Sequence, residues 1–245
     1  MYDPVKDGVP KSTQSVSYIE APAPESLANL VHCFWEMKTD SRLTEDFTLH
    51  ALPDACVNLL FDQHDTDIAG VTALQTTHTM LNLGREFHYV GVQFYPGVWR
   101  ALDSTVDHYV GTSYDGDLPL LATNRRLVGL EFSSMGGVLA ELVDQLADGG
   151  IVVPNAVTAA ILTNLEGITS VSDMASAAAL SPRQLQRRLK AETGFSPHDL
   201  LKVLRLQKSF RHDYLLSFAD QSHFTHSFRE LTGFTPGEFQ KRFDV

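Results

Sequence analysis

Between residues 15 and 110, apolar and polar residues alternate in short runs. Apolar side chains occupy every second position at Val57, Leu59 and Phe61, and again at Val90, Val92 and Phe94. Thr77–Leu83 has a similar pattern and Leu49–Leu52 a weaker one, while Glu25–Glu36 begins with helical spacing and ends as a strand at His32–Trp35. Several short strands separated by Pro, Gly and Asp favour a small barrel or a double-sheet roll.

From Leu127 onward the apolar residues follow a helical spacing. One stripe is formed by Val138, Leu139, Leu142, Val143 and Leu146, and a second, shorter helix is expected at Ala156–Leu165. The stripe suits packing against a core as well as packing against a second copy of the chain. Gly149–Pro154 interrupts the helices, so we expect two domains, at residues 1–153 and 154–245.

One segment of the last third occurs twice, 39 residues apart. Ser181–Pro197 returns as Asp220–Pro236, and the ending Gly-Phe-Ser-Pro of the first copy returns as Gly-Phe-Thr-Pro in the second. Leu185 and Leu189 of the first copy are replaced by phenylalanine in the second. A repeat of this kind indicates one supersecondary unit that is used twice.

The first copy has the residues that begin and end a helix. Ser181 is a preferred N-cap, and Pro182 suits the first helical position. Leu185 and Leu189 are four residues apart and share a face, from which the basic side chains point away. Gly194 allows the left-handed conformation that ends many helices. The segment is therefore predicted to be an amphipathic helix with a basic outer face.

A second helix is expected just upstream. Ser170–Asp173 resembles a capping box with aspartate in place of glutamate, and it opens the alanine-rich segment Met174–Ala179. A support helix, a short turn at Leu180–Ser181 and an arginine-rich helix have the order of a helix-turn-helix. The other interpretation is an amphipathic helix pair whose basic face is merely solvated.

With these motifs, residues 168–243 resemble the DNA-binding domain of AraC/XylS-type transcription regulators. The resemblance rests on Ser181–Lys190, Gly194–Pro197, the run Asp-Gln-Ser-His-Phe that ends at Phe224, and Gly233–Pro236. It implies two helix-turn-helix units that are joined by a long helix and that insert two recognition helices into successive major-groove segments.

The resemblance also assigns candidate DNA-contacting residues. Arg183, Gln186 and Arg187 take the base-contacting positions of the first unit, and Gln184, Arg188 and Lys190 take phosphate-contacting or support positions. In the second unit, Gln221, Ser222 and His226 take the groove-facing positions, with Arg229 nearby. Arginine bonds guanine through two hydrogen bonds and glutamine bonds adenine in the same way, so these side chains suit base recognition.

The second copy departs from the family pattern in two ways. His226 stands where the family usually has arginine and where the first copy has Arg187, and a neutral histidine lacks both the charge and the planar fork. The offset between the copies is also short, because Arg211–Phe218 leaves little room for a support helix before Ala219. We therefore expect a shortened second unit and a specificity that depends mainly on the first.

The charge of the chain is unevenly distributed. The formal net charge is −11, but residues 168–245 hold 11 Lys and Arg against 8 Asp and Glu. The acidity therefore belongs to the first part of the chain. Phosphate contacts require local positive charge rather than a basic protein, so the acidic total does not exclude binding to DNA.

A less specific resemblance covers the N-terminal part. Trp35, Leu52–Asp54, Val57–Leu59 and Gly91–Gly97 resemble the cupin-like sensor domain that precedes this DNA-binding module in some family members. The resemblance implies a pocket for a small-molecule effector inside the roll and a homodimer formed through helices such as residues 136–148. Candidate pocket residues are the aromatic side chains Trp35, Phe61, Tyr95 and Trp99, each of which also suits a core position.

Several other functions find no support in the sequence. There is no apolar run long enough for a membrane span, no signal segment, no phosphate-binding glycine loop and no Gly-x-Ser-x-Gly turn. The six histidines before residue 150 lack metal-ligand spacing, although His50, Asp54 and Cys56 are close enough in sequence to meet on one rim. We therefore expect no enzyme, no metal and no other cofactor.

The two cysteines are also consistent with a chain that holds no metal. Cys33 and Cys56 suit buried thiols in a reducing cytoplasm, and a disulfide between them has little support. DNA-repair methyltransferases carry a similar DNA-binding module but use a four-cysteine zinc site, which two cysteines cannot build.

The sequence thus predicts an α+β chain, with an N-terminal cupin-like β-roll or barrel with helices followed by an all-α helix-turn-helix domain. The predicted function is a cytoplasmic, sequence-specific transcription regulator that binds double-stranded DNA and responds to a small molecule. The alternative is a protein-interaction module whose degenerate helix-turn-helix no longer recognises DNA.

Overall fold

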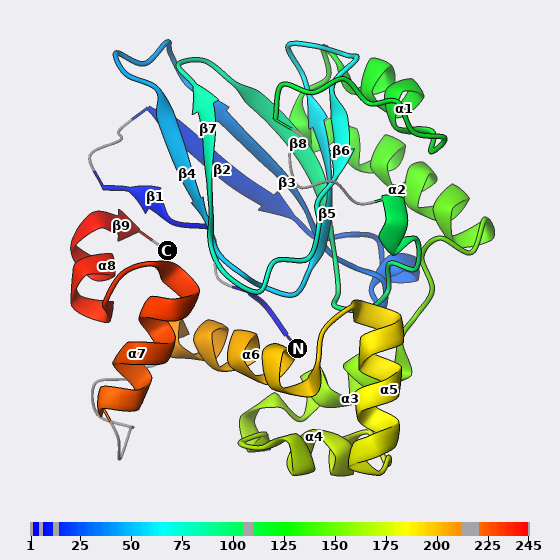
Figure 1. The fold of residues 1–245 in the computed structure, drawn as a ribbon. Helices are drawn as coiled ribbons and strands as arrows, with labels where there is room; N and C mark the ends of the chain where they lie inside the picture. Colours follow the sequence, from blue (N-terminus) through cyan, green and yellow to red (C-terminus); the bar gives the residue numbers. More distant parts are fainter. Residues whose placement is uncertain (1, 5–6, 12–14, 105–109, 212–220, 245) are drawn as a thin grey trace.

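The computed structural model describes the chain except residues 1, 5–6, 12–14, 105–109, 212–220 and 245. A β-rich body lies above a row of helices in the view of Figure 1. The strands are β1 Val9–Pro10, β2 Val16–Ala21, β3 Val31–Thr39, β4 Phe47–Ala51, β5 Val57–Asp62, β6 Ala69–Val71, β7 Thr79–Gly84, β8 His88–Phe94 and β9 Phe243–Asp244. The helices are α1 Leu120–Leu127, α2 Phe132–Asp148, α3 Ala156–Thr163, α4 Val171–Ala177, α5 Pro182–Thr193, α6 Pro197–Arg211, α7 Gln221–Thr232 and α8 Pro236–Arg242, with 3-10 turns at Glu25–Leu27, Leu102–Ser104 and Leu165–Gly167.

The β-rich body is a roll of two antiparallel sheets. Five strands pair in the order β2-β3-β8-β5-β6, and β4 pairs with β7. Because side chains alternate along a strand, Val90 and Val92 of β8 face the helices α1 and α2, whereas Tyr89 packs with residues of β4 and β7. The predicted α+β class, with a β-roll followed by helices, is confirmed.

The apolar stripe of α2 packs against the five-stranded sheet. Leu139, Leu142, Val143 and Leu146 are at most 2% exposed and belong to the same core as the inner face of β8. Of the two interpretations of this stripe, the structure supports core packing, because side chains buried within one chain cannot also form a dimer face.

The helices from α3 onward follow one another along the lower side of the roll. Asn155 caps α3, since its side-chain oxygen accepts hydrogen bonds from the backbone N–H groups of Val157 and Thr158. The long α6 separates the pair α4 and α5 from the pair α7 and α8 (Figure 1). The chain then returns to its own beginning, where β9 pairs with β1.

The strands and helices expected from the alternation are largely present. β4, β5, β7 and β8 match the predicted runs, and Glu25–Leu27 is a single 3-10 turn before β3. The sequence pattern missed α1 and the pairing of β1 with β9. A two-residue strand has no periodicity to detect, and its partner lies at the other end of the chain.

Candidate DNA-binding helix and ligand cavity

Helix α5 begins and ends as its sequence predicts. Ser181 Oγ accepts a hydrogen bond from the backbone N–H of Gln184, whose side chain accepts one in return from the backbone N–H of Ser181. Pro182 takes the first helical position, and Gly194 ends the helix with a φ of 74°. Each such cap stabilises a helix by about 1 kcal/mol, so α5 is well defined at both ends.

Three of the six polar residues predicted to contact DNA in α5 are used within the protein. Gln184 completes the capping box. Arg188 forms an ion pair with Glu192 at 2.9 Å, and the Lys190 ammonium donates a hydrogen bond to the Gly194 carbonyl at 2.7 Å. These are the residues to which the resemblance assigns phosphate-contacting or support positions, and their contacts here are structural.

The other three have no such role. Arg183, Gln186 and Arg187 are exposed and form no hydrogen bond or ion pair within the described part of the chain. Their spacing of three and four residues places them on one face of the helix. Leu185 and Leu189, both fully buried, lie on the face that packs against neighbouring helices. The side chains predicted to contact bases therefore form a free polar stripe.

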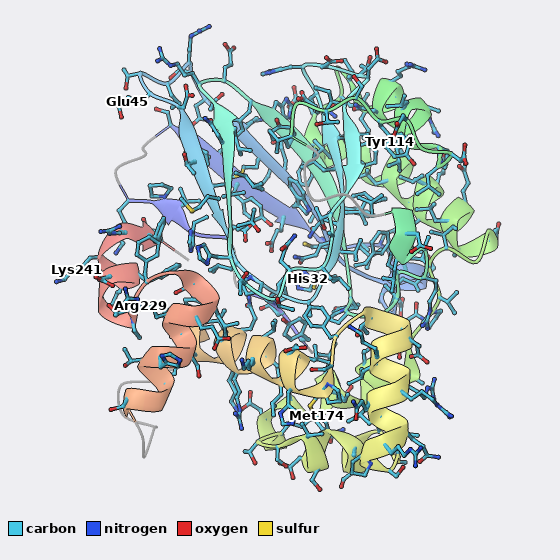
Figure 2. The ribbon with its side chains drawn as sticks, viewed as in Figure 1. His32, Glu45, Tyr114, Met174, Arg229 and Lys241 are labelled. Carbon is cyan, nitrogen blue, oxygen red and sulfur yellow. The ribbon has the colours of Figure 1, made fainter. Side chains whose placement is uncertain are left out.

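Helix α4 supports α5. Ser170 caps α4 by accepting a hydrogen bond from the backbone N–H of Asp173, and the Asp173 carboxylate accepts hydrogen bonds from the backbone N–H and the hydroxyl of Thr169. Met174, fully buried and labelled in Figure 2, packs between α4 and α5. Ala179 has a φ of 52° and ends the helix before the turn. The predicted order of support helix, turn and arginine-rich helix is confirmed.

The second unit presents a similar face. Ser222, His226 and Arg229 of α7 are exposed, and Arg229 is labelled in Figure 2. Gln221 begins α7, but its side chain lies outside the described residues. Only residues 212–220 separate α6 from α7, and they too are outside the described part, as is most of the segment Arg211–Phe218. The shortening of this unit therefore stays a prediction.

The repeat in sequence is also a repeat in hydrogen bonds. The hydroxyls of Thr193 and Thr232 each donate to the carbonyl four residues earlier, at 2.7 and 2.8 Å. Each hydroxyl also accepts from the backbone N–H two residues later, at 3.1 and 3.3 Å. Gly194 and Gly233 both have positive φ. The same short sequence thus builds the same helix end twice.

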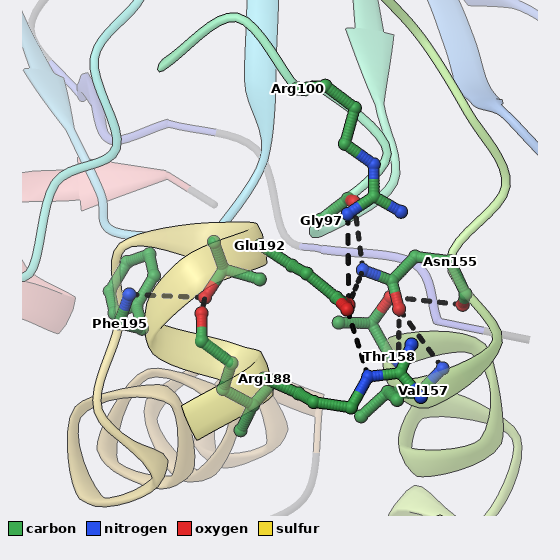
Figure 3. Close-up of polar contacts among 10 residues, drawn as sticks. Gly97, Arg100, Asn155, Val157, Thr158, Arg188, Glu192 and Phe195 are labelled. Atoms are coloured by element: carbon green, nitrogen blue, oxygen red, sulfur yellow. Dashed lines mark hydrogen bonds and ion pairs between the residues drawn. The ribbon is translucent and has the colours of Figure 1, made fainter. Parts of the chain in front are cut away.

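The C-terminal end of α5 contacts the β-rich body through a polar network (Figure 3). The Glu192 carboxylate accepts a hydrogen bond from the Asn155 amide at 2.9 Å and lies 3.7 Å from the Arg100 guanidinium. The Asn155 amide also donates to the Gly97 carbonyl at 2.9 Å. A Cβ at Gly97 would lie 2.7 Å from the Asn155 amide nitrogen, so the close approach requires glycine.

The C-terminal end of α7 contacts the β-rich body in another way. The backbone N–H of His78 donates to the Leu231 carbonyl at 2.7 Å, and a Cβ at Gly233 would lie 2.7 Å from the His78 ring. The His50 ring stacks on His78 and on Phe243, each with ring centroids 4.8 Å apart. Burial lowers the pKa of His50 to about 4, and the neighbouring His78 adds to the effect.

A cavity of about 290 Å³ lies between the two sheets of the roll. Leu49 and Leu60 contribute to its apolar wall from opposite sheets. Trp35 lies across Gly91, where a Cβ would come within 2.2 Å of the indole, and the indole N–H donates to the Asn58 side chain at 3.1 Å. Glycine in this strand therefore lets the indole lie against the sheet and line the cavity.

Part of the cavity wall is acidic. The Asp54 carboxylate accepts hydrogen bonds from the Cys56 backbone N–H and from the Gln93 side-chain amide, both at 2.8 Å. The Asp7 carboxylate accepts one from the Leu52 backbone N–H at 2.8 Å. Burial raises the pKa of Asp54 to about 7, with the nearby Asp7 carboxylate adding to the rise, and burial raises the pKa of Asp7 to about 6.

Of the four aromatic residues predicted for the pocket, the structure brings only Trp35 to the cavity. Phe61 and Trp99 are at most 1% exposed and belong to the core shared with α2. Tyr95 packs where that core meets the helices. The strand register decides the difference, because Phe61 points to the opposite face from its neighbour Leu60. Asn58 and Leu60, on the other face of β5, line the cavity instead.

No group of three or more His, Cys, Asp or Glu side chains in the described part of the chain is arranged to hold a metal ion. His50, Asp54 and Cys56 do not form a common rim, since His50 belongs to the aromatic cluster under α7 while Asp54 and Cys56 line the cavity. Cys33 and Cys56 are buried and form no disulfide with each other, as predicted. None of the described helices has the length and apolar character of a membrane span.

Comparisons with known proteins cover the two parts unequally. A family model described as a domain of unknown function, DUF6597, matches residues 19–112, which include the second half of β2 and all of β3 to β8. Among solved structures, ToxT from Vibrio cholerae is similar over 92% of this chain and 98% of its own, with 9% sequence identity and a TM-score of 0.43. The search of curated proteins finds no match. The family model ends before α1, so the role of α4–α8 has to be argued from their own residues.

Proposed function

We propose that this chain is a sequence-specific DNA-binding transcription regulator of the AraC/XylS type. The observation that carries the proposal is the stripe of Arg183, Gln186 and Arg187, exposed and without partners in the described part of the chain, on a helix capped at both ends. Guanidinium and amide groups are those that bond the edges of guanine and adenine. The opposite face of α5 is buried, so the stripe is free to enter a groove while the helix stays folded.

The position of the second unit supports contacts from both helices. α6 has 15 residues and is therefore about 22 Å long. α5 and α7 lie at its opposite ends (Figure 1). With a helix width of about 10 Å added, the separation approaches the rise of about 34 Å in one turn of DNA. Two such helices suit two successive major-groove segments on one side of a duplex.

The segment Leu52–Asp54 supports a response to a small molecule. Asp54 lines the cavity, and the Pro53 carbonyl accepts a hydrogen bond from the Gln207 side chain of α6 at 2.9 Å. Leu52 packs in one cluster with Leu206 of α6. A molecule in the cavity would therefore touch Leu52 and Pro53, which also contact the long helix, and Asp54 next to them. It would alter DNA binding only if it bound one arrangement of the helices better than another.

The remaining features of the proposal concern organisation. We place the division of the chain between 153 and 154, because Val152 belongs to the core of the β-rich body and Asn155 caps the first helix of the second part. We also propose a homodimer that acts in the cytoplasm on repeated half-sites. Sedimentation of the purified chain with and without duplex DNA tests the dimer.

DNA binding by the purified chain tests the proposed function. The probe is a duplex from the region directly upstream of the chain's own coding sequence, titrated at several salt concentrations. The double variant Arg183→Ala/Arg187→Ala should lose about 100-fold in affinity, because each guanidinium contact to a base is worth about 1–3 kcal/mol.

Arg125→Ala is the matched control. It also removes an exposed arginine, one that forms an ion pair with Asp67 in the N-terminal part, and affinity should change less than about twofold. The regulator assignment fails if the chain binds no duplex at low salt, or if the double variant binds DNA as tightly as the wild type. The protein-interaction alternative would then take its place.

A further inference from the structure

The cavity in the roll combines aromatic rings and carboxylates. Its aromatic lining residues are Tyr18, Trp35 and Tyr89, and its acidic ones are Asp7, Glu20, Asp54 and Asp244. None of the described lining residues is Lys, Arg or His. The wall thus carries negative charge and electron-rich ring faces, and the described lining provides no side-chain cation.

Two of the four carboxylates, Glu20 and Asp244, are exposed to solvent. Asp244 lies 3.5 Å from the Lys11 ammonium, and Glu20 accepts a hydrogen bond from the Tyr18 hydroxyl at 2.9 Å. Asp7 and Asp54 are less exposed, and among the described residues they accept hydrogen bonds from neutral backbone and amide N–H groups. Two neighbouring, partly buried carboxylates that have no cationic partner in the described part of the chain are unfavourable, as their raised pKa values reflect.

We propose that this cavity binds a small organic amine cation, with its ammonium group against Asp7 and Asp54 and its apolar body against Trp35 and Tyr89. An ammonium would supply the charge that the two carboxylates lack and would donate charge-assisted hydrogen bonds to them. The ring faces of Trp35 and Tyr18, which stack with centroids 6.4 Å apart, favour a cation as well.

The size of the cavity limits the occupant to a small molecule. Its volume of about 290 Å³ is at the lower end of the range of small-molecule sites, about 300–1,000 Å³. An anionic ligand would place a third negative charge beside Asp7 and Asp54, so carboxylates of the same shape should be rejected. The inference rests on the proposed function only in naming this cavity as the effector site.

Binding of three matched probes to the full chain tests the inference. Phenethylamine, phenethyl alcohol and phenylacetate share an aromatic body and differ in carrying a positive, zero or negative charge. Calorimetry should show the amine binding at least about tenfold more tightly than either of the others, a difference that a single charge-assisted contact can supply. The fluorescence of Trp35 should change with the same affinity.

Variants locate the ammonium group. Asp54→Asn and Asp7→Asn keep a hydrogen-bond acceptor but remove the charge. Each should lower the affinity for phenethylamine at least about tenfold and change the affinity for phenethyl alcohol less than about twofold. Asp67→Asn, whose exposed carboxylate pairs with Arg125 outside the cavity, is the control and should change amine affinity less than about twofold. If one variant does not fold, the other variant and the three-probe comparison on the wild type decide.

The outcomes separate this inference from the proposed function. Three outcomes would overturn the inference, even if DNA binding is intact. Phenylacetate could bind as tightly as the amine or more tightly, no probe could bind, or the amine affinity could be the same in both aspartate variants as in the wild type. Amine binding with the expected variant pattern would support it, even in a chain that binds no duplex. A chain that binds the amine but no duplex would overturn the regulator assignment alone.

Discussion

The two repeated units end their helices identically but differ in what supports them. α5 packs on α4 through helical core residues such as Met174 and Leu189. α7 packs on α6 and α8 through phenylalanines, and its cluster includes Leu52 from the N-terminal part. Local hydrogen bonds depend on a few neighbouring residues and are repeated with the sequence, whereas tertiary support is not. The second unit thus depends for its packing on the β-rich body.

The largest expected effect is a loss of unfolding free energy at acid pH, through the contacts that support the second unit. His50 has a pKa lowered from 6.5 to about 4, so the unfolded chain binds a proton at this residue in a range where the folded chain does not. Its contribution to stability is therefore complete above pH 6.5 and is lost as the pH falls toward about 4. The full loss is about 3 kcal/mol.

Urea unfolding of wild type and His50→Phe across this pH range measures the contribution. Asp7 and Asp54 act in the opposite direction, because their raised pKa values favour the folded state at low pH and that advantage is lost as the pH rises. Both proteins contain these carboxylates, so their contribution cancels when the two unfolding free energies are subtracted. A difference that does not vary with pH would show that His50 is not held neutral in the cluster.

The same contrast explains which features were predictable from the sequence. Ser181 and Gly194 could be assigned to the ends of α5 because caps depend on residues three or four positions away. The contacts of His50 and His78 with α7 join segments more than a hundred residues apart, and no local pattern records them. Phe61 was misplaced because alternation identifies two faces of a strand but does not say which one meets the cavity.

A matched pair of glycines tests the support of the two units directly. Gly194→Ala forces alanine to adopt positive φ in open space and should cost about 1 kcal/mol. Gly233→Ala has the same backbone cost, but its Cβ also meets the His78 ring, which is stacked on His50. It should cost about 1 to 2 kcal/mol more. Denaturant unfolding at neutral pH gives both values.

The double variant Gly233→Ala/His78→Ala identifies the cause of that difference. Removing the ring should return the cost of Gly233→Ala, measured in the His78→Ala background, to the value found for Gly194→Ala. Equal costs for the two glycines in the wild-type background would mean that His78 moves aside freely and does not support α7.

DNA binding should depend unequally on the two units. Arg187→Ala removes a charged fork that suits guanine and should weaken binding about tenfold or more, whereas His226→Ala, at the same position of the repeat, should cost less than about threefold. Both residues are exposed, so neither change should disturb the fold. Titrations at fixed salt check this. An equal loss from both would show that the second unit contributes as much specificity as the first.

The smallest expected effect concerns the way each unit meets the β-rich body. Glu192 and Leu231 occupy the same position of the repeat, yet Glu192 makes the contact through its carboxylate and Leu231 through its backbone carbonyl. In both units this leaves the N-terminal half of the helix, α5 or α7, on the side away from the body (Figure 1). Glu192→Gln keeps an acceptor for Asn155 but loses the ion pairs with Arg188 and Arg100, and should cost about 1 kcal/mol at low salt.

Salt distinguishes the two kinds of contact. Because ion pairs at a partly exposed junction are screened, the cost of Glu192→Gln should fall to about half or less between about 0.01 M and about 1 M salt. The cost of Gly233→Ala, which arises from van der Waals overlap, should stay constant over the same range. Unfolding free energies of the two variants against wild type at both salt concentrations provide the measurement. A salt-independent cost at Glu192 would mean that its hydrogen bond with Asn155, and not its charge, joins α5 to the β-rich body.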